Sequence, residues 1–299
     1  MHVFLTGGSG QLGPAVVSEL ITAGHRVTGL ARSDAAAEQL EGLGAAVLRG
    51  SLDDLGVLAD GAERSDGVVH MAFGSAELHD PLAVIHRDMT AIRTLGDAIA
   101  GTDKPLVSTS GTFATAPGRI STEGDPANPE AVAGLRSGSE RVSRELASQG
   151  IRSILVRLAP SVHGPGDRGL VPALVSIARR TGVSAYVGNG SNRWPAVHRL
   201  DAAALFRLAL EKAPRGSVVH GVGETAVTLA SIAHSIGEGL AVPTRSIDAA
   251  EASEHYGGDL MAAVFSTDSP ASSTYTRRLV GWSPRHPTLL QDLRNGVYF

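Results

Sequence analysis

The sequence predicts an α/β fold, a doubly wound parallel sheet with a small C-terminal lobe. Two observations support this prediction. Over the first 160 residues, short apolar runs alternate with longer segments of helical periodicity. The short runs are almost continuously apolar, as strands buried on both faces require. Beyond Pro160 the order is mixed and Gly and Pro are denser, so we divide the chain into residues 1–160 and 161–299.

Each predicted element follows from its local pattern. Short apolar or β-branched runs predict strands at residues 2–5, 25–30, 46–48, 67–71, 106–108 and 154–158. Helical periodicity predicts helices at residues 12–23, 35–43, 81–100 and 129–148. The second region is expected to add late elements of the sheet and to form the lobe.

Composition limits the function classes. The chain of 299 residues has 26 basic and 30 acidic residues, which gives no strong field for nucleic acid or an anionic membrane. It has no Cys, which excludes disulfides and thiolate chemistry and suits a reducing compartment. The apolar run Val3-Phe4-Leu5 is too short for a signal peptide or a membrane span. We therefore expect a cytoplasmic protein whose partners are small molecules or copies of itself.

A glycine-rich turn follows the first predicted strand. Residues 6–13 read TGGSGQLG and open the first predicted helix. Such a turn lets the backbone approach a pyrophosphate, and the helix N-terminus offers it free N–H groups. The predicted dinucleotide contacts in this turn are Thr6, Gly7, Ser9, Gly10, Gln11, Leu12 and Gly13.

The end of the second strand favours NADP(H) over NAD(H). An NAD enzyme places an acid there for the ribose 2′-hydroxyl, but this chain has Ala31 followed by Arg32. Arg32, helped by Ser33 and Ser9, suits a 2′-phosphate, although a solvated surface Arg is the alternative. Asp53 is placed to accept a hydrogen bond from the adenine amino group or to cap a helix. The other predicted cofactor contacts are Leu52, Met71, Ala72 and Arg136.

These segments together resemble the extended and atypical branches of the short-chain dehydrogenase/reductase superfamily. The resemblance rests on TGGSGQLG, Arg32, and the later segments GSLDD, VVHMA, LVSTSGT, RLAPSVHGPGD and WPAVHRLDAA, in order over about the first 200 residues. It implies a Rossmann domain with a small substrate-binding lobe. Such proteins often form homodimers through the helices that correspond to residues 81–100 and 129–148.

The catalytic residues that the resemblance implies are only partly present. In that superfamily a Ser polarises the substrate carbonyl, a Tyr transfers the proton, and a Lys four residues later holds the nicotinamide ribose. Ser110 matches the Ser, but Val132 and Arg136 stand at the Tyr and Lys positions. No Tyr in the chain is followed four residues later by Lys.

Another group must therefore supply the proton, or the chain performs no such chemistry. General acid catalysis typically contributes about 10²–10⁴-fold. Arg136 suits binding of the ribose and of a developing oxyanion, but a guanidinium is a poor acid. His163, in a segment that lies beside the nicotinamide in the superfamily, is the better candidate, because imidazole titrates near neutral pH. A His satisfied by loop carbonyls is the alternative.

The Gly-rich segment 182–201 combines aromatic, amide and basic side chains, a composition frequent in ligand-binding loops. The predicted substrate contacts are Phe73, Thr112, Tyr186, Trp194 and His198. Trp194 has a structural alternative, since a buried Trp usually belongs to a core. The His residues lack metal-ligand spacing, so we predict no metal site.

Two functions of different classes remain open. The first is an NADP(H)-dependent oxidoreductase that transfers hydride to a small carbonyl or imine without the usual Tyr and Lys. A protonated imine needs less help, because it already carries the charge that accepts hydride. The second is a non-catalytic NADP(H)-binding redox sensor, with an isomerase or lyase as a weaker third possibility. Ser110 beside the 182–201 segment favours the enzyme, whereas the missing dyad favours the sensor.

Overall fold

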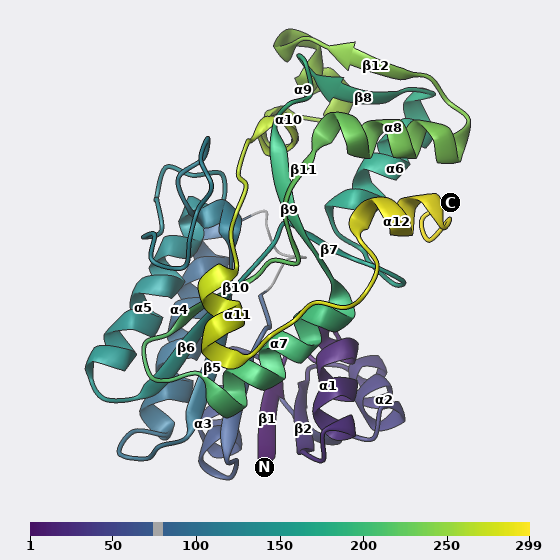
Figure 1. Ribbon diagram of the computed structural model, residues 1–299. Helices are drawn as coiled ribbons and strands as arrows, with labels where there is room; N and C mark the ends of the chain where they lie inside the picture. Colours follow the sequence, from purple (N-terminus) through teal and green to yellow (C-terminus); the bar gives the residue numbers. More distant parts are fainter. Residues whose placement is uncertain (74–79) are drawn as a thin grey trace.

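A parallel sheet of seven strands forms the centre of the computed structural model, which describes residues 1–73 and 80–299. The strand order is β10-β6-β5-β4-β1-β2-β3 (Figure 1). The bounds are β1 His2–Thr6, β2 Arg26–Ala31, β3 Ala46–Arg49, β4 Gly67–His70, β5 Pro105–Gly111, β6 Arg152–Leu158 and β10 Val218–Gly221. The pairings between these strands are all parallel. The predicted α/β fold with a doubly wound parallel sheet is confirmed.

Helices cover both faces of this sheet. One face carries α1 Gly13–Thr22, α2 Asp34–Gly42 and α7 Arg199–Lys212; the other carries α3 Leu55–Glu63, α4 Pro81–Ala98 and α5 Ser137–Ser148. Strand β1 shows how the sequence produces this arrangement. Val3 and Leu5 pack into the core under α1 and α7, whereas Phe4 between them packs into the core under α3 and α4. Because side chains alternate along a strand, a continuously apolar run supplies both cores.

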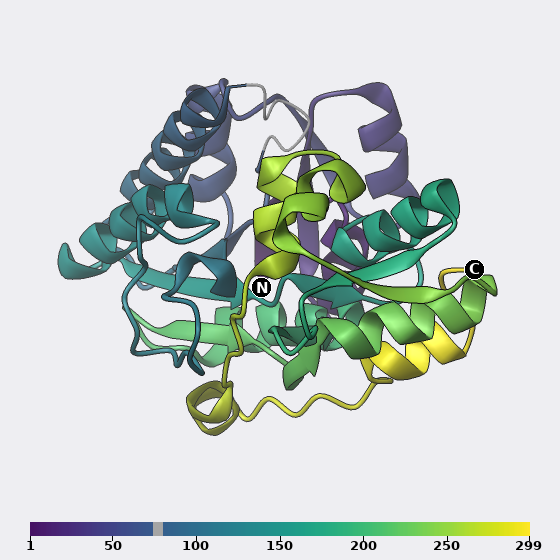
Figure 2. The same cartoon turned by 90° about the horizontal axis from the view of Figure 1, so that it is seen from above.

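The C-terminal half returns to the sheet and also builds the lobe, which Figure 2 shows from above, lying over the sheet. The lobe strands are β7 Ser161–His163, β9 Arg193–His198 and β11 Glu224–Thr228 in one sheet, and β8 Ser184–Val187 and β12 Thr244–Ile247 in another. Its helices are α6 Leu170–Thr181, α8 Leu229–Leu240, α9 Ala249–Tyr256, α10 Asp259–Ser266 and α12 Leu289–Arg294. Helix α11 Thr274–Val280 instead packs on α7 and β10 of the large domain.

The structure corrects the predicted helix at residues 129–148, because α5 begins only at Ser137. A side chain at Gly134 would overlap the carbonyl of Pro129, so the chain turns tightly there instead of continuing a helix. Backbone N–H groups of Gly134 and Arg136 bond carbonyls three residues back, which gives a 3-10 turn at Gly134–Arg136. Helix α3 is absent from the sequence-based elements, since its nine residues include two Gly and give a weak periodic signal.

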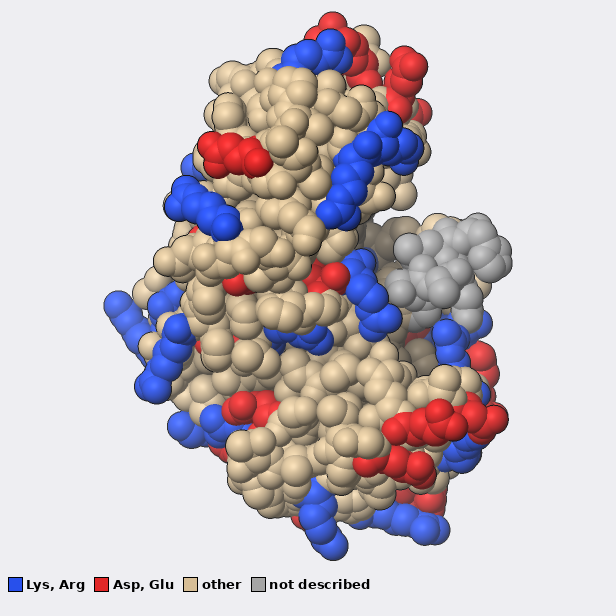
Figure 3. Space-filling model, turned by 90° about the vertical axis from the view of Figure 1, so that its right-hand side faces the viewer, with Lys and Arg blue, Asp and Glu red and all other residues tan. Residues whose placement is uncertain are grey.

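The surface carries both signs of charge. On the face in Figure 3, Lys and Arg side chains are interspersed with Asp and Glu, as the net charge of −4 leads one to expect. Across residues 1–73 and 80–299, no helix is both long enough and apolar enough to cross a membrane.

Candidate active site

A cleft of about 640 Å³ lies at the carboxyl ends of the central strands. Parallel α/β sheets bind ligands at this edge, where the strand order reverses, and here the reversal falls between β1 and β4. The cleft combines residues from the glycine turn, the ends of β2 to β6 and the start of α6. Its lining includes Gly7, Ser9, Gly10, Gln11, Leu12, Gly13, Arg32, Leu52, Asp53, Met71, Ala72, Phe73, Arg87, Ser110, Arg136 and Val162.

The glycine turn forms the floor of the cleft and needs glycine for steric reasons. Gly7 has a φ of +79°, and a Cβ there would lie 2.6 Å from the backbone nitrogen of Ala72. A Cβ on Gly13 would overlap the carbonyl oxygens of Gly7 and Gly8. The Gly10 N–H donates to the Gly7 carbonyl at 3.0 Å and closes the turn. The turn thus brings backbone and the N-terminus of α1 to the cleft, which fits a pyrophosphate.

Thr6 acts beneath this turn and does not line the cleft. Its hydroxyl lies 2.8 Å from Nδ1 of buried His70 and accepts from the backbone N–H of Ala72. Nε2 of His70 lies 3.1 Å from the carboxylate of Asp88. Burial alone raises the pKa of Asp88, but the contacts with His70, Arg136 and Ser139 outweigh it, and the net shift is downward. This buried chain fixes the end of β4 relative to the glycine turn.

Two arginines line the end of the cleft where the sequence predicts the adenosine, which we call the adenosine end. Arg32 lines the cleft at the end of β2, where the sequence predicts a 2′-phosphate contact. Arg87 of α4 also lines it and donates from Nε to Asp53 at 2.9 Å, so the carboxylate predicted for adenine binds an arginine. The Ser33 hydroxyl caps α2 by accepting from the Ala36 N–H.

The reactive end contains a buried group of three side chains. Ser110, at the end of β5, donates its hydroxyl hydrogen to Oε1 of Glu140 at 2.7 Å. Arg157 of β6 donates to both oxygens of Glu140, at 3.0 and 2.6 Å. The exposed fractions of Ser110, Glu140 and Arg157 are 3%, 1% and 0%. We refer to these residues as the Ser110 group.

Arg136 lies beside this group, at the Lys position of the resemblance. Its guanidinium stacks on the Phe73 ring at 3.4 Å, donates to the Thr109 carbonyl at 3.0 Å and lies 4.0 Å from Asp88. Burial lowers the pKa of Arg136, although Asp88 and Glu140 oppose that shift. Val132, at the Tyr position, packs against the apolar core of the lobe and has no hydroxyl to offer. Predicted residues Phe73, Ser110 and Arg136 are thus brought together.

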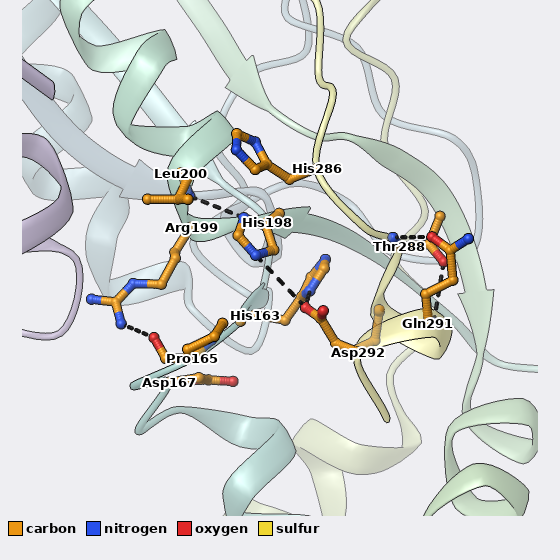
Figure 4. Close-up of polar contacts among 12 residues, drawn as sticks. His163, Pro165, Asp167, His198, Arg199, Leu200, His286, Thr288, Gln291 and Asp292 are labelled. Atoms are coloured by element: carbon orange, nitrogen blue, oxygen red, sulfur yellow. Dashed lines mark hydrogen bonds and ion pairs between the residues drawn. The ribbon is translucent and has the colours of Figure 1, made fainter. Parts of the chain in front are cut away.

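His163 is not brought to the cleft, and this geometry does not support it as the catalytic acid. Its side chain is buried, and Nδ1 lies 2.6 Å from Asp292 of α12 (Figure 4). Of the three residues of β7, Val162 is the one that lines the cleft. Because side chains alternate along a strand, Val162 faces the cleft whereas His163 faces the opposite side, toward Asp292.

His198, predicted as a substrate contact, has a structural role. Its Nδ1 accepts from the Leu200 N–H and caps α7, and its ring stacks on His286 (Figure 4). Burial lowers the pKa of His198 to about 4. His198 thus packs between the start of α7 and His286, and it is not among the residues that line the cleft.

Tyr186 and Trp194 also lie away from the cleft lining. Trp194 is fully buried between the rings of Phe113 and Phe265, and its indole N–H donates to the Thr267 carbonyl. Tyr186 stacks on His234 of α8. Trp194 is therefore part of the core of the lobe, the alternative to a substrate contact. Segment 182–201 mainly builds the lobe. Thr112 is fully buried, although its neighbours Gly111 and Phe113 line the cleft.

The Glu140–Arg157 pair and Arg87 are absent from the site residues predicted from the sequence. Arg157 had a signal there, because a charged residue inside the apolar predicted strand at residues 154–158 requires a buried partner. Within the described residues, no group of three or more His, Asp or Glu side chains is placed to hold a metal.

Comparisons with known proteins place the chain in a family. Residues 3–221 match the NAD dependent epimerase/dehydratase family. The chain belongs to this family. It is an oxidoreductase of the short-chain dehydrogenase/reductase type, as the fold and the reductases among its relatives indicate.

Three relatives illustrate the range of similarity. An uncharacterized protein of Saccharomyces cerevisiae is 42% identical, over 98% of each chain. The 2-alkyl-3-oxoalkanoate reductase of Stenotrophomonas maltophilia is 30% identical, over 74% of this chain and 68% of its own. A crystal structure of the dTDP-glucose 4,6-dehydratase DesIV of Streptomyces venezuelae with NAD and TYD bound has a TM-score of 0.80 at 20% identity, covering 99% of this chain and 96% of its own. This last likeness concerns the fold alone.

Proposed function

We propose that the protein is an NADP(H)-dependent oxidoreductase that transfers hydride to a small carbonyl or imine substrate. One observation carries the proposal: a single cleft joins the glycine turn and Arg32 at one end to Ser110 and Arg136 at the other. The cleft thus offers residues suited to bind a dinucleotide and, beside them, residues suited to bind a small substrate.

The adenosine end supports the preference for NADP(H). A guanidinium pairs well with a phosphate, because its planar donors match two phosphate oxygens. Arg32 lines the cleft at the end of β2, and Arg87 lines it nearby. Ala31, just before Arg32, offers no acid to the 2′-hydroxyl on which NAD enzymes rely.

At the reactive end, the bound reduced nicotinamide supplies the hydride, and the chain positions the acceptor. Arg136 is held by Phe73, Thr109 and Asp88, so its guanidinium is fixed at the reactive end, where a carbonyl substrate would develop an oxyanion. The described residues that line the cleft include no Tyr and no His. We infer that the described residues act by electrostatic positioning more than by a Tyr or His acid.

The named relative supports reduction as the reaction type. The Stenotrophomonas maltophilia protein is called a reductase of an oxoalkanoate, and the alignment with it spans most of the present chain. We infer the same reaction class here and leave the substrate to experiment. A homodimer through α4 and α5 remains a prediction, which light scattering of the purified protein checks.

NADPH consumption tests the proposed function. The purified protein is incubated with NADPH and a panel of ketones, quinones and imines, and absorbance at the nicotinamide band is followed. We expect at least one class to be reduced. The redox-sensor alternative predicts no consumption and a strong difference in affinity between NADPH and NADP⁺, whereas similar affinities for both suit an enzyme.

A further inference from the structure

The Ser110 group extends across neighbouring strands of the sheet. Ser110 on β5 is in register with Arg157 on β6, so the two side chains leave the sheet on the same face. Helix α5 packs on both strands and places Glu140 between these side chains. Burial of all three side chains makes the arrangement rigid, because each polar atom left unpaired costs free energy.

The hydrogen bonds fix the direction in which the Ser110 hydroxyl points. Glu140 receives two hydrogen bonds from the Arg157 guanidinium, and Arg157 also donates to the Asp125 carbonyl at 2.8 Å. Both oxygens of Glu140 thus act as acceptors, one of them also for Ser110. A serine hydroxyl has one hydrogen, and here it goes to Glu140.

Ser110 therefore has no hydrogen left for a substrate in the cleft. Its Oγ retains lone pairs, which suit a reacting atom that carries its own hydrogen. A ketone or aldehyde oxygen has no such hydrogen. The nitrogen of a protonated imine has one.

We propose that Ser110 accepts a hydrogen bond from the reacting atom, and that the substrate is a protonated imine and not a ketone or aldehyde. The proposal rests on the proposed function and narrows its substrate class. Hydride from NADPH forms a C–H bond at the imine carbon, and the C=N π electrons become the nitrogen lone pair. The products are a neutral amine and NADP⁺, so the step needs no proton from the protein.

This assignment explains how the chain works with Val132 at the Tyr position. An oxyanion formed from a ketone must gain a proton, and Arg136 is a poor acid. The amine formed from a protonated imine needs none in the hydride step. The cationic imine is tolerated because each nearby arginine has a carboxylate beside it: Arg157 pairs with Glu140, and Arg136 lies 4.0 Å from Asp88. Glu140 and Arg157 are positioning residues, since they act through Ser110.

A single introduced thiol tests the direction of the Ser110 hydrogen bond. The chain has no Cys, so Ser110→Cys creates a unique reporter whose thiolate absorbance is titrated in the cofactor-free protein. A carboxylate that accepts the thiol hydrogen raises the thiol pKa above the ordinary value of about 8.5. We expect such a raised pKa and a fall of about one pH unit or more when Glu140→Gln is added.

The control is Glu145→Gln, which changes a half-exposed carboxylate on the same helix and should leave the thiol titration unchanged. A thiol in Ser110→Cys that ionises near neutral pH overturns the proposal, because it shows that the arginines dominate at this position. This first readout needs no Glu140 variant, so the test stands even where Glu140→Gln folds poorly.

Matched substrates test the chemical class. NADPH oxidation is compared for cyclic imines with five to seven ring atoms, such as 2-methyl-1-pyrroline, and for the cyclic ketones of the same ring size. We expect the imines to react at least tenfold faster, with rates that rise as pH falls toward the imine's own pKa. Faster reduction of the ketones, or reduction of neither, overturns the substrate assignment. Failure to bind NADPH is a different result, which removes the proposed function and leaves the thiol titration readable.

Discussion

The two ends of the cleft differ in which part of the chain forms them, backbone at one end and side chains at the other. At the end with the glycine turn, the backbone forms the site: Gly7 and Gly13 bring the chain close to itself, where no side chain fits. At the reactive end, side chains make the site: Ser110, Glu140 and Arg157 come from two strands and a helix and are almost completely buried.

This difference determines how each end responds to change. A backbone site depends on a few glycines, so its loss should appear first in cofactor affinity. A site of buried charges also contributes to the core, so its loss should appear first in stability. The following experiments test this contrast, from the largest expected effect to the smallest.

Breaking the buried ion pair should have the largest effect. Arg157→Met leaves the Glu140 carboxylate without its partner in the core, which should lower the free energy of unfolding by about 3–5 kcal/mol. Urea unfolding measures this change. The double variant Arg157→Met/Glu140→Leu should recover most of the loss, because no lone charge remains.

The exposed pair Arg141–Glu145 on the same helix provides the control. Arg141→Ala should cost no more than about 1 kcal/mol. Similar losses for Arg157→Met and Arg141→Ala would contradict a structural role for the buried pair.

Adding one methyl group to the glycine turn should come next. Gly13→Ala forces the turn away from the carbonyls of Gly7 and Gly8, and strain of about 1–3 kcal/mol should weaken NADPH binding by up to about 100-fold. Calorimetric titration of the folded variant measures the loss. Gly56→Ala, in α3 with open space around it, should leave the affinity unchanged. Equal affinities for both variants would mean that the turn does not hold the pyrophosphate.

Titration of His198, which lies outside the cleft, should make the free energy of unfolding depend on pH. His198 has its pKa lowered to about 4 in the folded protein, against about 6.5 when unfolded, so the unfolded state binds the proton more tightly. Stability from this group is complete above pH 6.5 and is lost as pH falls toward 4. We expect His198 to contribute a loss of about 2 kcal/mol between pH 7 and pH 5, measured by urea unfolding of the wild type and the His198 variant at each pH.

His198→Asn keeps a capping acceptor at the start of α7 and removes the titrating ring. Its stability should therefore change less between pH 7 and pH 5 than that of the wild type. An unchanged pH dependence would show that another group is responsible.

The smallest effect should be the change in cofactor preference. Arg32→Ala removes one cation from the adenosine end, so NADPH binding should weaken about tenfold, or about 1.4 kcal/mol, while NADH binding stays nearly constant. Titration of both nucleotides into wild type and variant measures this. Equal losses for the two nucleotides would show that Arg32 does not select between them.

The same contrast explains what the sequence could predict. The strand around Phe4, the turn at Gly7 and the place of Arg32 follow from patterns within a few residues, and the structure shows them where expected. The Ser110–Glu140 contact joins residues 30 positions apart, and its direction depends on Arg157. No local pattern contains that information.

His163 and Trp194 show that a residue's place in a motif does not determine where its side chain lies in the fold. His163 lies within a segment that resembles a nicotinamide-side segment of the superfamily, but its ring faces Asp292, 129 residues further along the chain. Segment 182–201 has the composition of a binding loop, yet Trp194 in it fills the core of the lobe. Composition indicates that a segment is unusual, whereas tertiary packing decides whether it meets a ligand or a core.

The most direct test of this account is a calorimetric titration of the wild-type protein with NADPH and NADH. We predict saturable NADPH binding at least tenfold tighter than NADH binding, with the glycine turn holding the pyrophosphate and Arg32 meeting the 2′-phosphate. Equal affinities would contradict the role of Arg32. Absence of binding by either nucleotide would contradict the central claim that this cleft is a dinucleotide site.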